Sequence, residues 1–326
     1  MGLMPDDLAV HDTSPGPAAA TGAGRGPSGR RPGGRARASG LVLGSALSLQ
    51  FGAAVAALLF PRAGALGVVT LRLLFGAVVL MVMCRPRLRG HSRADWGLVA
   101  AFGLALGGMN TLFYQAIERI PLGAAVTLEV LGPLVLSVVA SRRAVSWLWA
   151  VLALGGVLLL GRGGFDELNA AGVAYALGAG ALWVLYILLS ARTGRRFAGS
   201  DGLALALVVA AALSLPLGVA SAGRTLLDPV TLGLGAAVAL LSSVLPYSLE
   251  LASLRRLPAA TFAVLMSVEP AVAAVAGFLV LDQALSLVTG LAIGLVVAAS
   301  IGAVLTPPAP RTRPAGAPRT PPVSAP

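Results

Sequence analysis

Four ionisable side chains stand inside long apolar stretches of this sequence, where their burial needs a chemical reason. They are Arg72, Glu129, Glu250 and Glu269. A charged group costs free energy in an apolar environment, so such residues usually pair with each other or take part in binding and proton transfer. One arginine cannot neutralise both Glu129 and Glu269. We therefore expect at least one of these carboxyls to take up a proton, because burial favours the neutral form.

Two interpretations of these groups are open. They could line a polar cavity that binds a zwitterion or relays protons, with Arg72 facing a carboxylate and a glutamate facing an ammonium group. Alternatively, Arg72 forms a structural ion pair with one glutamate, because buried charges usually pair. The helical rise places Arg72, Glu129 and Glu269 near the middle of their apolar stretches, and Glu250 nearer one end.

Further polar and aromatic side chains could line the same cavity. Asn110 and Tyr114 are four residues apart and share one face of a helix. Tyr247 follows Pro246, whose missing N–H leaves a backbone carbonyl that must face protein or water. For each of these side chains, an ordinary packing contact or interhelical hydrogen bond is the competing explanation. The candidate substrate- or proton-binding residues are Arg72, Asn110, Tyr114, Glu129, Trp183, Tyr186, Tyr247, Glu250 and Glu269.

Catalytic and metal chemistry is not expected. The chain has one cysteine, Cys84, and two histidines, His11 in the N-terminal segment and His91 in a predicted loop, so neither a Cys- nor a His-based metal site is expected. All 24 basic residues are arginines, and without lysine the phosphate-binding loop GxxxxGK cannot form. The motifs HExxH and GxSxG are absent as well. We therefore expect no enzyme, no cofactor and no ATP hydrolysis by this chain.

The elements that carry these side chains must be membrane-spanning helices. Hydrophobic residues make up 57% of the chain and charged residues 11%, whereas soluble domains carry about 25% charged residues. A span needs about 20 apolar residues. The sequence predicts an all-α integral membrane protein with ten transmembrane helices, at residues 41–60, 64–84, 96–117, 121–140, 145–161, 170–191, 202–221, 230–253, 258–280 and 284–305.

The arginines indicate how the chain crosses the lipid bilayer. The net charge is +11, but the arginines lie in short loops and two tails, which argues against nucleic-acid binding. If the N-terminus is cytoplasmic, nineteen arginines fall on the cytoplasmic side and four outside, with Arg72 inside a span. Positive charge is enriched in cytoplasmic loops. We therefore expect both termini in the cytoplasm and an even number of spans.

An internal repeat underlies the spans. Residues 1–40 are rich in Arg, Gly and Pro and residues 306–326 in Pro, so we expect disordered cytoplasmic tails there. When the apolar region is compared with itself at an offset of 137 residues, two hairpins superpose, with Pro121 on Pro258 and Pro133 on Pro270. Because the shift covers an odd number of spans, residues 41–161 and 170–305 are predicted to form two inverted five-helix repeats. Inverted repeats are typical of alternating-access transporters, which bind their substrate near the midplane.

Two pairs of glycines spaced by four residues predict close helix packing. Gly103 precedes Gly107 in the third span, and Gly290 precedes Gly294 in the tenth. Small residues at this spacing let two helix backbones approach each other.

The residues also resemble a known family. The stretches 107–114, 121–123, 128–133, 178–188, 245–250 and 265–271 resemble the bacterial threonine/homoserine exporters of the EamA branch of the drug/metabolite transporter superfamily. The similarity extends over about residues 48–305. Two positions depart from the pattern: Ala57 stands where some relatives carry lysine, and residues 281–283 read Leu-Asp-Gln where Leu-Gly-Glu is usual.

The resemblance implies a secondary active transporter in the bacterial inner membrane. It would export small amino acids of the threonine or homoserine kind by proton antiport, with the substrate, protons and lipid as partners and a homodimer as a candidate assembly. Efflux of another small metabolite or a drug is the alternative within transport. A non-transporting membrane sensor or enzyme is the alternative of a different class, and it lacks the catalytic constellation or soluble signalling domain that it would need.

Overall fold

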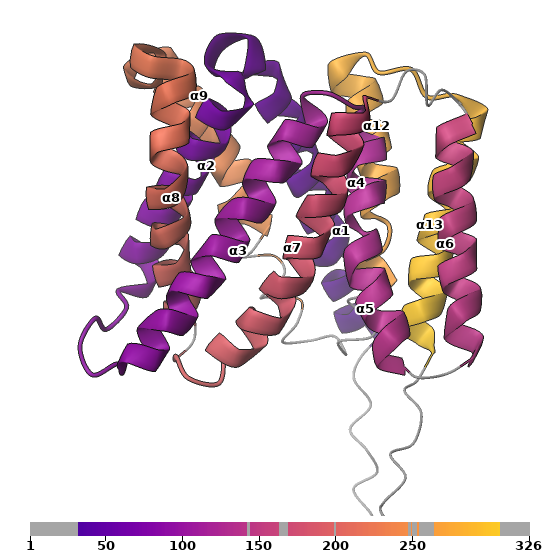
Figure 1. The fold of residues 1–326 in the computed structure, drawn as a ribbon, viewed down its shortest axis with the longest axis horizontal. Coiled ribbons are helices and arrows are strands. Elements are labelled where there is room, and N and C mark those ends of the chain that lie inside the picture. The colour runs from indigo at the N-terminus through magenta and orange to yellow at the C-terminus, as the bar shows by residue number, and fades with distance from the viewer. Residues whose placement is uncertain are drawn as a thin grey trace, which may run out of the picture.

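The computed structural model describes residues 32–141, 144–162, 169–198, 200–246, 249, 253 and 264–306. All regular elements among these residues are helices, and they stand side by side in one bundle (Figure 1). The first half contains α1 (Pro32–Leu58), α2 (Phe60–Cys84), α3 (Arg93–Ile117), α4 (Leu122–Glu129), α5 (Leu131–Ser141) and α6 (Ala144–Arg162). The second half contains α7 (Ala170–Thr193), α8 (Asp201–Ala222), η1 (Gly223–Leu227), α9 (Pro229–Ala239), η2 (Leu240–Val244), α12 (Glu269–Leu281) and α13 (Leu287–Leu305).

The membrane class expected from composition is confirmed. Eight of the described segments are long and apolar enough to cross a bilayer, and Leu122–Ala140, which contains α4 and most of α5, is one of them. Two further apolar helices, Ala144–Leu159 and Pro229–Val244, are shorter than the rest. These two segments fall where the fifth and eighth of the ten expected spans begin. The total of ten therefore depends on counting both of them.

The boundaries of the first helix differ from those expected. Helix α1 begins at Pro32, so residues 32–40, expected to be part of a disordered tail, are helical in the structure. Alanine and arginine, which are frequent in this stretch, favour helix when no proline follows the start. The remainder of the N-terminal tail and residues 307–326 lie outside the described residues.

Glycines set the closest helix contacts. A side chain at Gly103 would lie 2.6 Å from the carbonyl oxygen of Ala206, and one at Gly107 would lie 3.1 Å from Cα of Ala210, so α3 packs against α8 through these two positions. The packing role predicted for this pair is confirmed. Among the described residues, nothing lies within 4 Å of the corresponding positions at Gly290 and Gly294, so close packing at that pair is not seen there.

Two apolar spans are interrupted by a turn. The first breaks between α4 and α5 at Val130, and Pro133 follows one turn later. The second has a turn at residues 267–268, just before α12. Pro270 is the second residue of α12. Proline has no N–H to bond the carbonyl four residues before it, which weakens the helix there. The breaks at Val130 and Ser267 are 137 residues apart.

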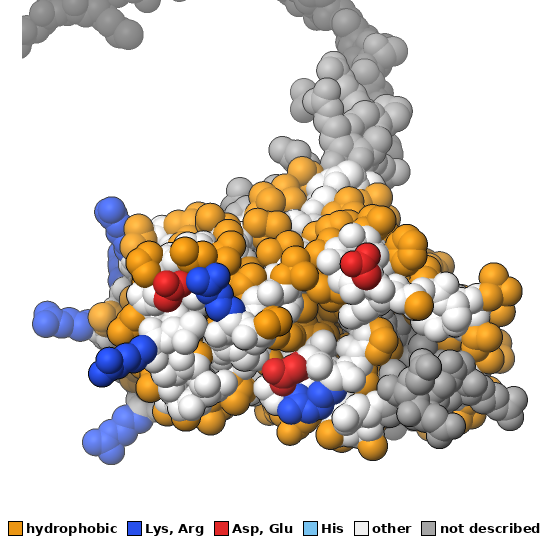
Figure 2. All heavy atoms as spheres, turned by 90° about the horizontal axis from the view of Figure 1, so that it is seen from above, with side chains coloured by type: hydrophobic (Ala, Val, Ile, Leu, Met, Phe, Trp, Pro, Cys, Tyr) orange, Lys and Arg blue, Asp and Glu red, His pale blue; other side chains and the backbone are white. Residues whose placement is uncertain are grey.

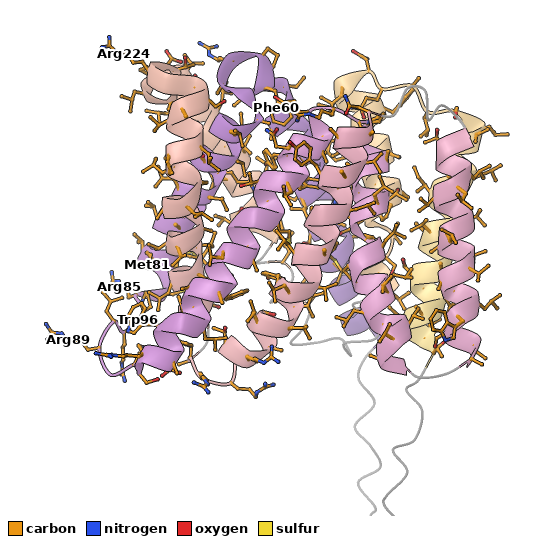
Figure 3. The ribbon with its side chains drawn as sticks, in the orientation of Figure 1. Phe60, Met81, Arg85, Arg89, Trp96 and Arg224 are labelled. Carbon is orange, nitrogen blue, oxygen red and sulfur yellow. The ribbon has the colours of Figure 1, made fainter. Side chains whose placement is uncertain are left out.

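The two ends of the bundle differ in charge. Figure 3 places Arg85 and Arg89 with Trp96 at the lower end and Arg224 at the upper end. On the upper face, acidic and basic side chains lie next to each other among apolar ones (Figure 2). One upper ion pair joins Arg62 to Asp228 at 3.4 Å. Hydrogen bonds from the backbone and hydroxyl of Thr231 lower the pKa of Asp228.

One hydrogen bond joins the outer ends of the two broken spans. The backbone N–H of Leu122, the first residue of α4, donates to Oε1 of Gln283 at 3.0 Å, just beyond the end of α12. Asp282, which ends α12, has a left-handed backbone with φ 53. The unusual Leu-Asp-Gln sequence thus supplies a side-chain cap for the N-terminus of α4.

Candidate functional site

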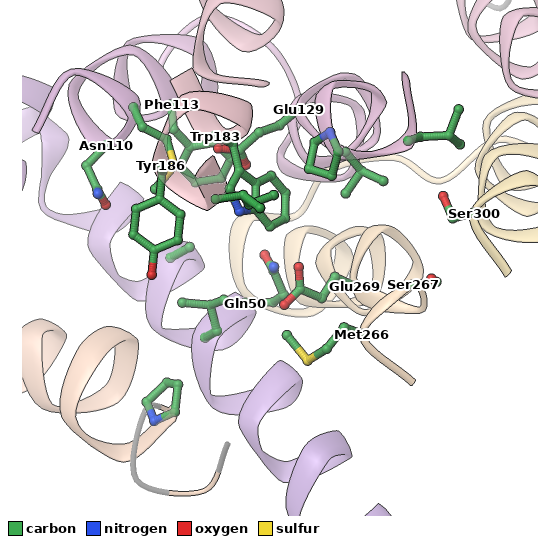
Figure 4. A pocket seen from close by; sticks show the side chains of 18 of the residues that line it. Gln50, Asn110, Phe113, Glu129, Trp183, Tyr186, Met266, Ser267, Glu269 and Ser300 are labelled. Carbon is green, nitrogen blue, oxygen red and sulfur yellow. The ribbon is translucent and has the colours of Figure 1, made fainter. Parts of the chain in front are cut away.

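A cavity of about 450 Å³ lies inside the bundle, within the range of about 300–1,000 Å³ usual for small-molecule sites (Figure 4). Side chains from both halves of the chain form its wall. Its lining is mostly apolar, with Leu49, Ala53, Met109, Phe113, Val130, Pro133, Leu134, Ile187, Pro246, Met266, Ala303 and Val304. The polar and aromatic lining residues are Gln50, Arg72, Asn110, Glu129, Ser137, Trp183, Tyr186, Ser267, Glu269 and Ser300.

The cation of the cavity is held by neutral groups. Arg72 is 7% exposed, and its guanidinium donates to the hydroxyl of Tyr114 at 3.3 Å, to Oγ of Ser243 at 3.4 Å and to the carbonyl of Ser242 at 3.0 Å. The guanidinium carbon also lies 5.5 Å from the centre of the Tyr114 ring. Among the described residues, no carboxylate comes within 4.0 Å of Arg72. The structural ion pair with Glu129 or Glu269, which the sequence left open, is therefore not formed.

The two central carboxyls flank the helix breaks. Glu129 is the last residue of α4, and Glu269 is the first residue of α12. Both line the cavity, and Glu269 is 3% exposed. Proline at position 133 has no N–H to donate to the carbonyl of Glu129. This carbonyl instead faces α7 at Gly180, where the Cβ of any other residue would lie 2.5 Å from the carbonyl oxygen. Glycine at position 180 therefore lets α7 support the break that positions Glu129.

Helices α3 and α7 contribute a polar and aromatic side of the cavity. Trp183 and Tyr186, from α7, both line it, as expected for residues three apart on one helix (Figure 4). Tyr186 also stacks on Phe102 with ring centres 5.3 Å apart, which fixes α7 against α3. The Nδ2 atom of Asn110 donates to the carbonyl of Leu106 at 2.8 Å, so the amide is anchored on its own helix while it faces the cavity.

The structure brings together six of the nine candidates and separates one. Arg72, Asn110, Glu129, Trp183, Tyr186 and Glu269 share the cavity. Tyr114 is completely buried and lies behind Arg72 rather than in the wall. Tyr247 and Glu250 lie outside the described residues.

Sequence reasoning missed several polar residues of the site. Gln50 in α1, Ser137 in α5, Ser267 before α12 and Ser300 in α13 all line the cavity, and Ser242 and Ser243 hold Arg72. Single serines in apolar helices usually bond their own backbone, so they give little signal. Gln50 did give a signal, because it is the one amide side chain of the first span.

Several residues of the cavity wall are 137 positions apart, the spacing of the predicted repeat. Five pairs of lining residues are separated by 137 positions: Leu49 and Tyr186, Gln50 and Ile187, Met109 and Pro246, Glu129 and Met266, and Val130 and Ser267. In most of these pairs one member is polar or aromatic and the other is aliphatic. Positions that the predicted repeat would pair therefore carry different chemistry.

The charges of the cavity suit a small zwitterion better than a metal ion. Within the part of the chain that the structure describes, no three His, Cys, Asp or Glu side chains gather as metal ligands. One guanidinium, two carboxyls and apolar walls offer complementary charge to a molecule that carries both an anionic and a cationic group.

Comparison with known proteins places the chain among transporters. A family model described as the EamA-like transporter family matches residues 170–305. The threonine/homoserine exporter RhtA of Salmonella typhimurium (strain LT2) is 46% identical over 242 residues, which are 73% of this chain and 81% of the exporter. The exporter of the same name from Escherichia coli (strain K12) is 44% identical over 249 residues, covering 76% and 84%.

A solved structure shares the fold. Described only as "Crystal structure of protein", it aligns with a TM-score of 0.55 over 82% of this chain and 96% of its own, at 19% sequence identity. At this identity the likeness concerns the arrangement of helices and carries no information about the substrate.

Proposed function

Because this chain belongs to the EamA-like transporter family, together with exporters that share nearly half of its aligned residues, we propose that it exports threonine, homoserine or closely related small amino acids. It is a multi-pass protein of the bacterial inner membrane. Its relatives are named as exporters and not as enzymes, in keeping with the absence of catalytic motifs from the sequence. The observation that supports the substrate class most directly is the cavity that combines Arg72 with two carboxyls.

In this proposal the cavity receives the amino acid by its two charged ends. Arg72 binds the substrate carboxylate, because its guanidinium lines the cavity with no carboxylate of the described residues bonded to it. Tyr114 and the two serines hold the guanidinium in place. The substrate ammonium takes a carboxyl that also lines the cavity, Glu129 or Glu269. Each substrate charge thereby meets an opposite one, which offsets its desolvation.

The cavity lies between two inverted five-helix repeats, of residues 41–161 and 170–305, that make up ten spans. The helix contacts support this proposal, because they recur when each half is exchanged for the other. Helix α3 packs on α8 as α9 packs on α2, and α4 packs on α7 as α12 packs on α1. The contacts of α2 with α8 and of α6 with α13 join equivalent spans. The five pairs of lining residues 137 positions apart support it independently.

Efflux is coupled to proton entry in this proposal. Two carboxyls in one apolar cavity resist joint ionisation, so one holds a proton at neutral pH. That group alternates between a proton and the substrate ammonium, which is what an exchanger requires. Glu250, outside the described residues, is proposed to tune this exchange from the cytoplasmic side.

The orientation puts both termini in the cytoplasm. It is supported by the lower end of the bundle, where Arg85 and Arg89 lie with Trp96 (Figure 3). In a Cys84→Ala background, a cysteine at Arg89 should be shielded from an impermeant thiol reagent in intact cells, and one at Asp228 should react. Labelling of the Arg89 position from outside would reverse the orientation.

The test of the function is efflux from cells and vesicles. Cells that overproduce the chain and are loaded with radiolabelled threonine should release it faster than cells carrying an Arg72→Leu variant at equal membrane abundance. In vesicles, a protonophore should stop net transport against a gradient, and ATP depletion should not. Equal threonine release by the two strains would overturn the export function, and efflux that is insensitive to the proton gradient would leave a facilitator.

A further inference from the structure

One amide in the cavity wall has an unused acceptor. Gln50, in the second half of α1, is 3% exposed, and its buried Oε1 has no hydrogen-bond partner among the described residues. Its side chain lines the cavity, and Figure 4 shows it beside Glu269, which comes from α12. Helices α1 and α12 pack directly against each other, so the two side chains enter the cavity from adjacent elements.

The chemistry of an amide oxygen restricts what can bind there. A carbonyl oxygen only accepts hydrogen bonds, so its partner must carry an N–H or O–H. A substrate carboxylate has neither. An amino acid offers two kinds of donor: its ammonium group and, when it has one, a side-chain hydroxyl.

The two donors differ in charge and therefore need different acceptors. The ammonium group carries a full charge, and in an apolar cavity it needs a carboxyl, which Glu269 provides next to Gln50. A hydroxyl is neutral and is well matched by a neutral acceptor. In threonine the hydroxyl-bearing carbon is bonded directly to the carbon that carries the ammonium, so its two donors lie next to each other as Glu269 and Gln50 do.

From this geometry we infer that Gln50 is a specificity-determining residue that accepts a hydrogen bond from the side-chain hydroxyl of the substrate. The inference rests on the proposed export of amino acids and narrows its substrates to hydroxylated ones. It accounts for a preference shared by threonine and homoserine, since the longer chain of homoserine can bring its hydroxyl to the same oxygen. Apolar amino acids of equal size leave Oε1 without a partner.

The size of the effect follows from the cost of that unpaired oxygen. Removing the donor from a buried hydrogen bond weakens binding by about five- to a hundred-fold. 2-Aminobutyrate is threonine without the hydroxyl, so it should compete with threonine that much less well.

The experiment is counterflow of radiolabelled threonine in proteoliposomes that contain the full chain, with unlabelled threonine, homoserine and 2-aminobutyrate as competitors. In the unaltered protein both hydroxylated amino acids should compete about five- to a hundred-fold better than 2-aminobutyrate. In Gln50→Leu, which keeps the bulk and removes the acceptor, the advantage should fall to about two-fold or less. It should fall because threonine and homoserine lose a hydrogen bond, while 2-aminobutyrate no longer leaves a buried oxygen without a partner.

Ser300→Ala is the matched control. Ser300 lines the cavity from α13, is 6% exposed, and its Oγ also has no partner among the described residues. This variant therefore removes a buried acceptor from another part of the cavity wall. It should retain the preference for hydroxylated substrates. Collapse of the preference in Ser300→Ala but not in Gln50→Leu would overturn the inference.

Two other outcomes also decide the matter. If Gln50→Leu elutes as a single species at normal yield but weakens all three competitors equally, Gln50 contacts a group that they share and the hydroxyl assignment is wrong. If the unaltered protein exchanges threonine without preferring it to 2-aminobutyrate, the inference fails while the export function stands. No threonine counterflow at all in the unaltered protein would instead refute the export function.

Discussion

The two broken spans have the same backbone design and carry different chemistry. Each is interrupted by a turn, at Val130 and at Ser267, and each has a proline three residues later, Pro133 and Pro270. The carboxyls do not follow this register. Glu129 precedes its break by one residue and Glu269 follows its break by two, so neither carboxyl occupies the position equivalent to the other.

The supports of the two breaks differ as well. At the first, Gly180 of α7 meets the carbonyl of Glu129, so backbone contacts backbone. At the second, the buried side chain of Val42 in α1 packs against Leu265 and Met266. The first break is therefore clamped by close-packed main chain, and the second is held by side chains.

The difference shows how two similar helix breaks can serve an unsymmetrical molecule. An amino acid has an anionic and a cationic end, so two identical half-sites would place a wrong charge at one of them. Arg72, the cation that lines the cavity, illustrates the solution. Arg72 lies in the first half, and the equivalent position of the second half is Val209.

The largest effect is expected from removing that cation. Arg72→Leu should lower threonine transport by about a hundred-fold or more, because the substrate carboxylate would enter an apolar cavity without a partner. Val209→Ala, at the equivalent position, should leave transport near the unaltered rate. Vesicle uptake at matched protein abundance measures both. Comparable losses in the two variants would show that the halves are not chemically distinct at this position.

Replacing each central carboxyl by its amide should separate the two breaks. Of the two variants Glu129→Gln and Glu269→Gln, one should lose the pH dependence of efflux while it still exchanges substrate for substrate. The other variant should remain pH-dependent, since in the proposed exchange only one carboxyl alternates between proton and ammonium. The measurement is efflux against pH beside counterflow in the same vesicles. Unchanged pH dependence in both variants would make the two carboxyls structural.

Enlarging the glycine at the first break should cost stability. Gly180→Val would force a branched side chain against the carbonyl of Glu129, and overpacking of this kind costs about 1–3 kcal/mol. Gly290→Ala, where nothing lies within 4 Å, should stay within about 0.5 kcal/mol of the unaltered protein. Unfolding in detergent micelles measures both variants. Equal stability of Gly180→Val and the unaltered protein would show that the main-chain contact is not close.

The smallest effect is expected at the second break. Val42→Ala removes two methyl groups from a contact between side chains, and it should cost about 1 kcal/mol because neighbouring side chains can partly fill the space. Its free energy of unfolding should fall less than that of Gly180→Val under the same conditions. The reverse order would show that the second break is the more rigid one.

The sequence predicted the apolar spans and the charged centre of the site well. Arg72, Glu129 and Glu269 are visible because a charge in an apolar run is rare, and the structure brings all three to one cavity. The packing of Gly103 and Gly107 was also predicted, but the same spacing at Gly290 and Gly294 meets nothing. A spacing shows which residues share a helix face, and it does not show whether another helix covers that face.

Other parts of the site could not be predicted from residue types. Tyr114 was expected in the wall with Asn110, and the structure turns it towards Arg72 instead. Ser242 and Ser243 were not recognised as partners of Arg72, because this contact joins residues 170 or 171 positions apart in the chain. Such a pairing depends on how α2 packs against the η2 segment, which local sequence does not specify.

The hydrogen bond between Leu122 and Gln283 bears on the timing of the transport cycle. Any motion that parts α4 from the end of α12 must break this bond, and both groups lie at an end of the bundle. A typical intramolecular hydrogen bond shifts an equilibrium by about two- to twelve-fold. If transport parts these two helices, this bond favours the arrangement in which they stay together by no more than that factor, so it slows the parting without preventing it.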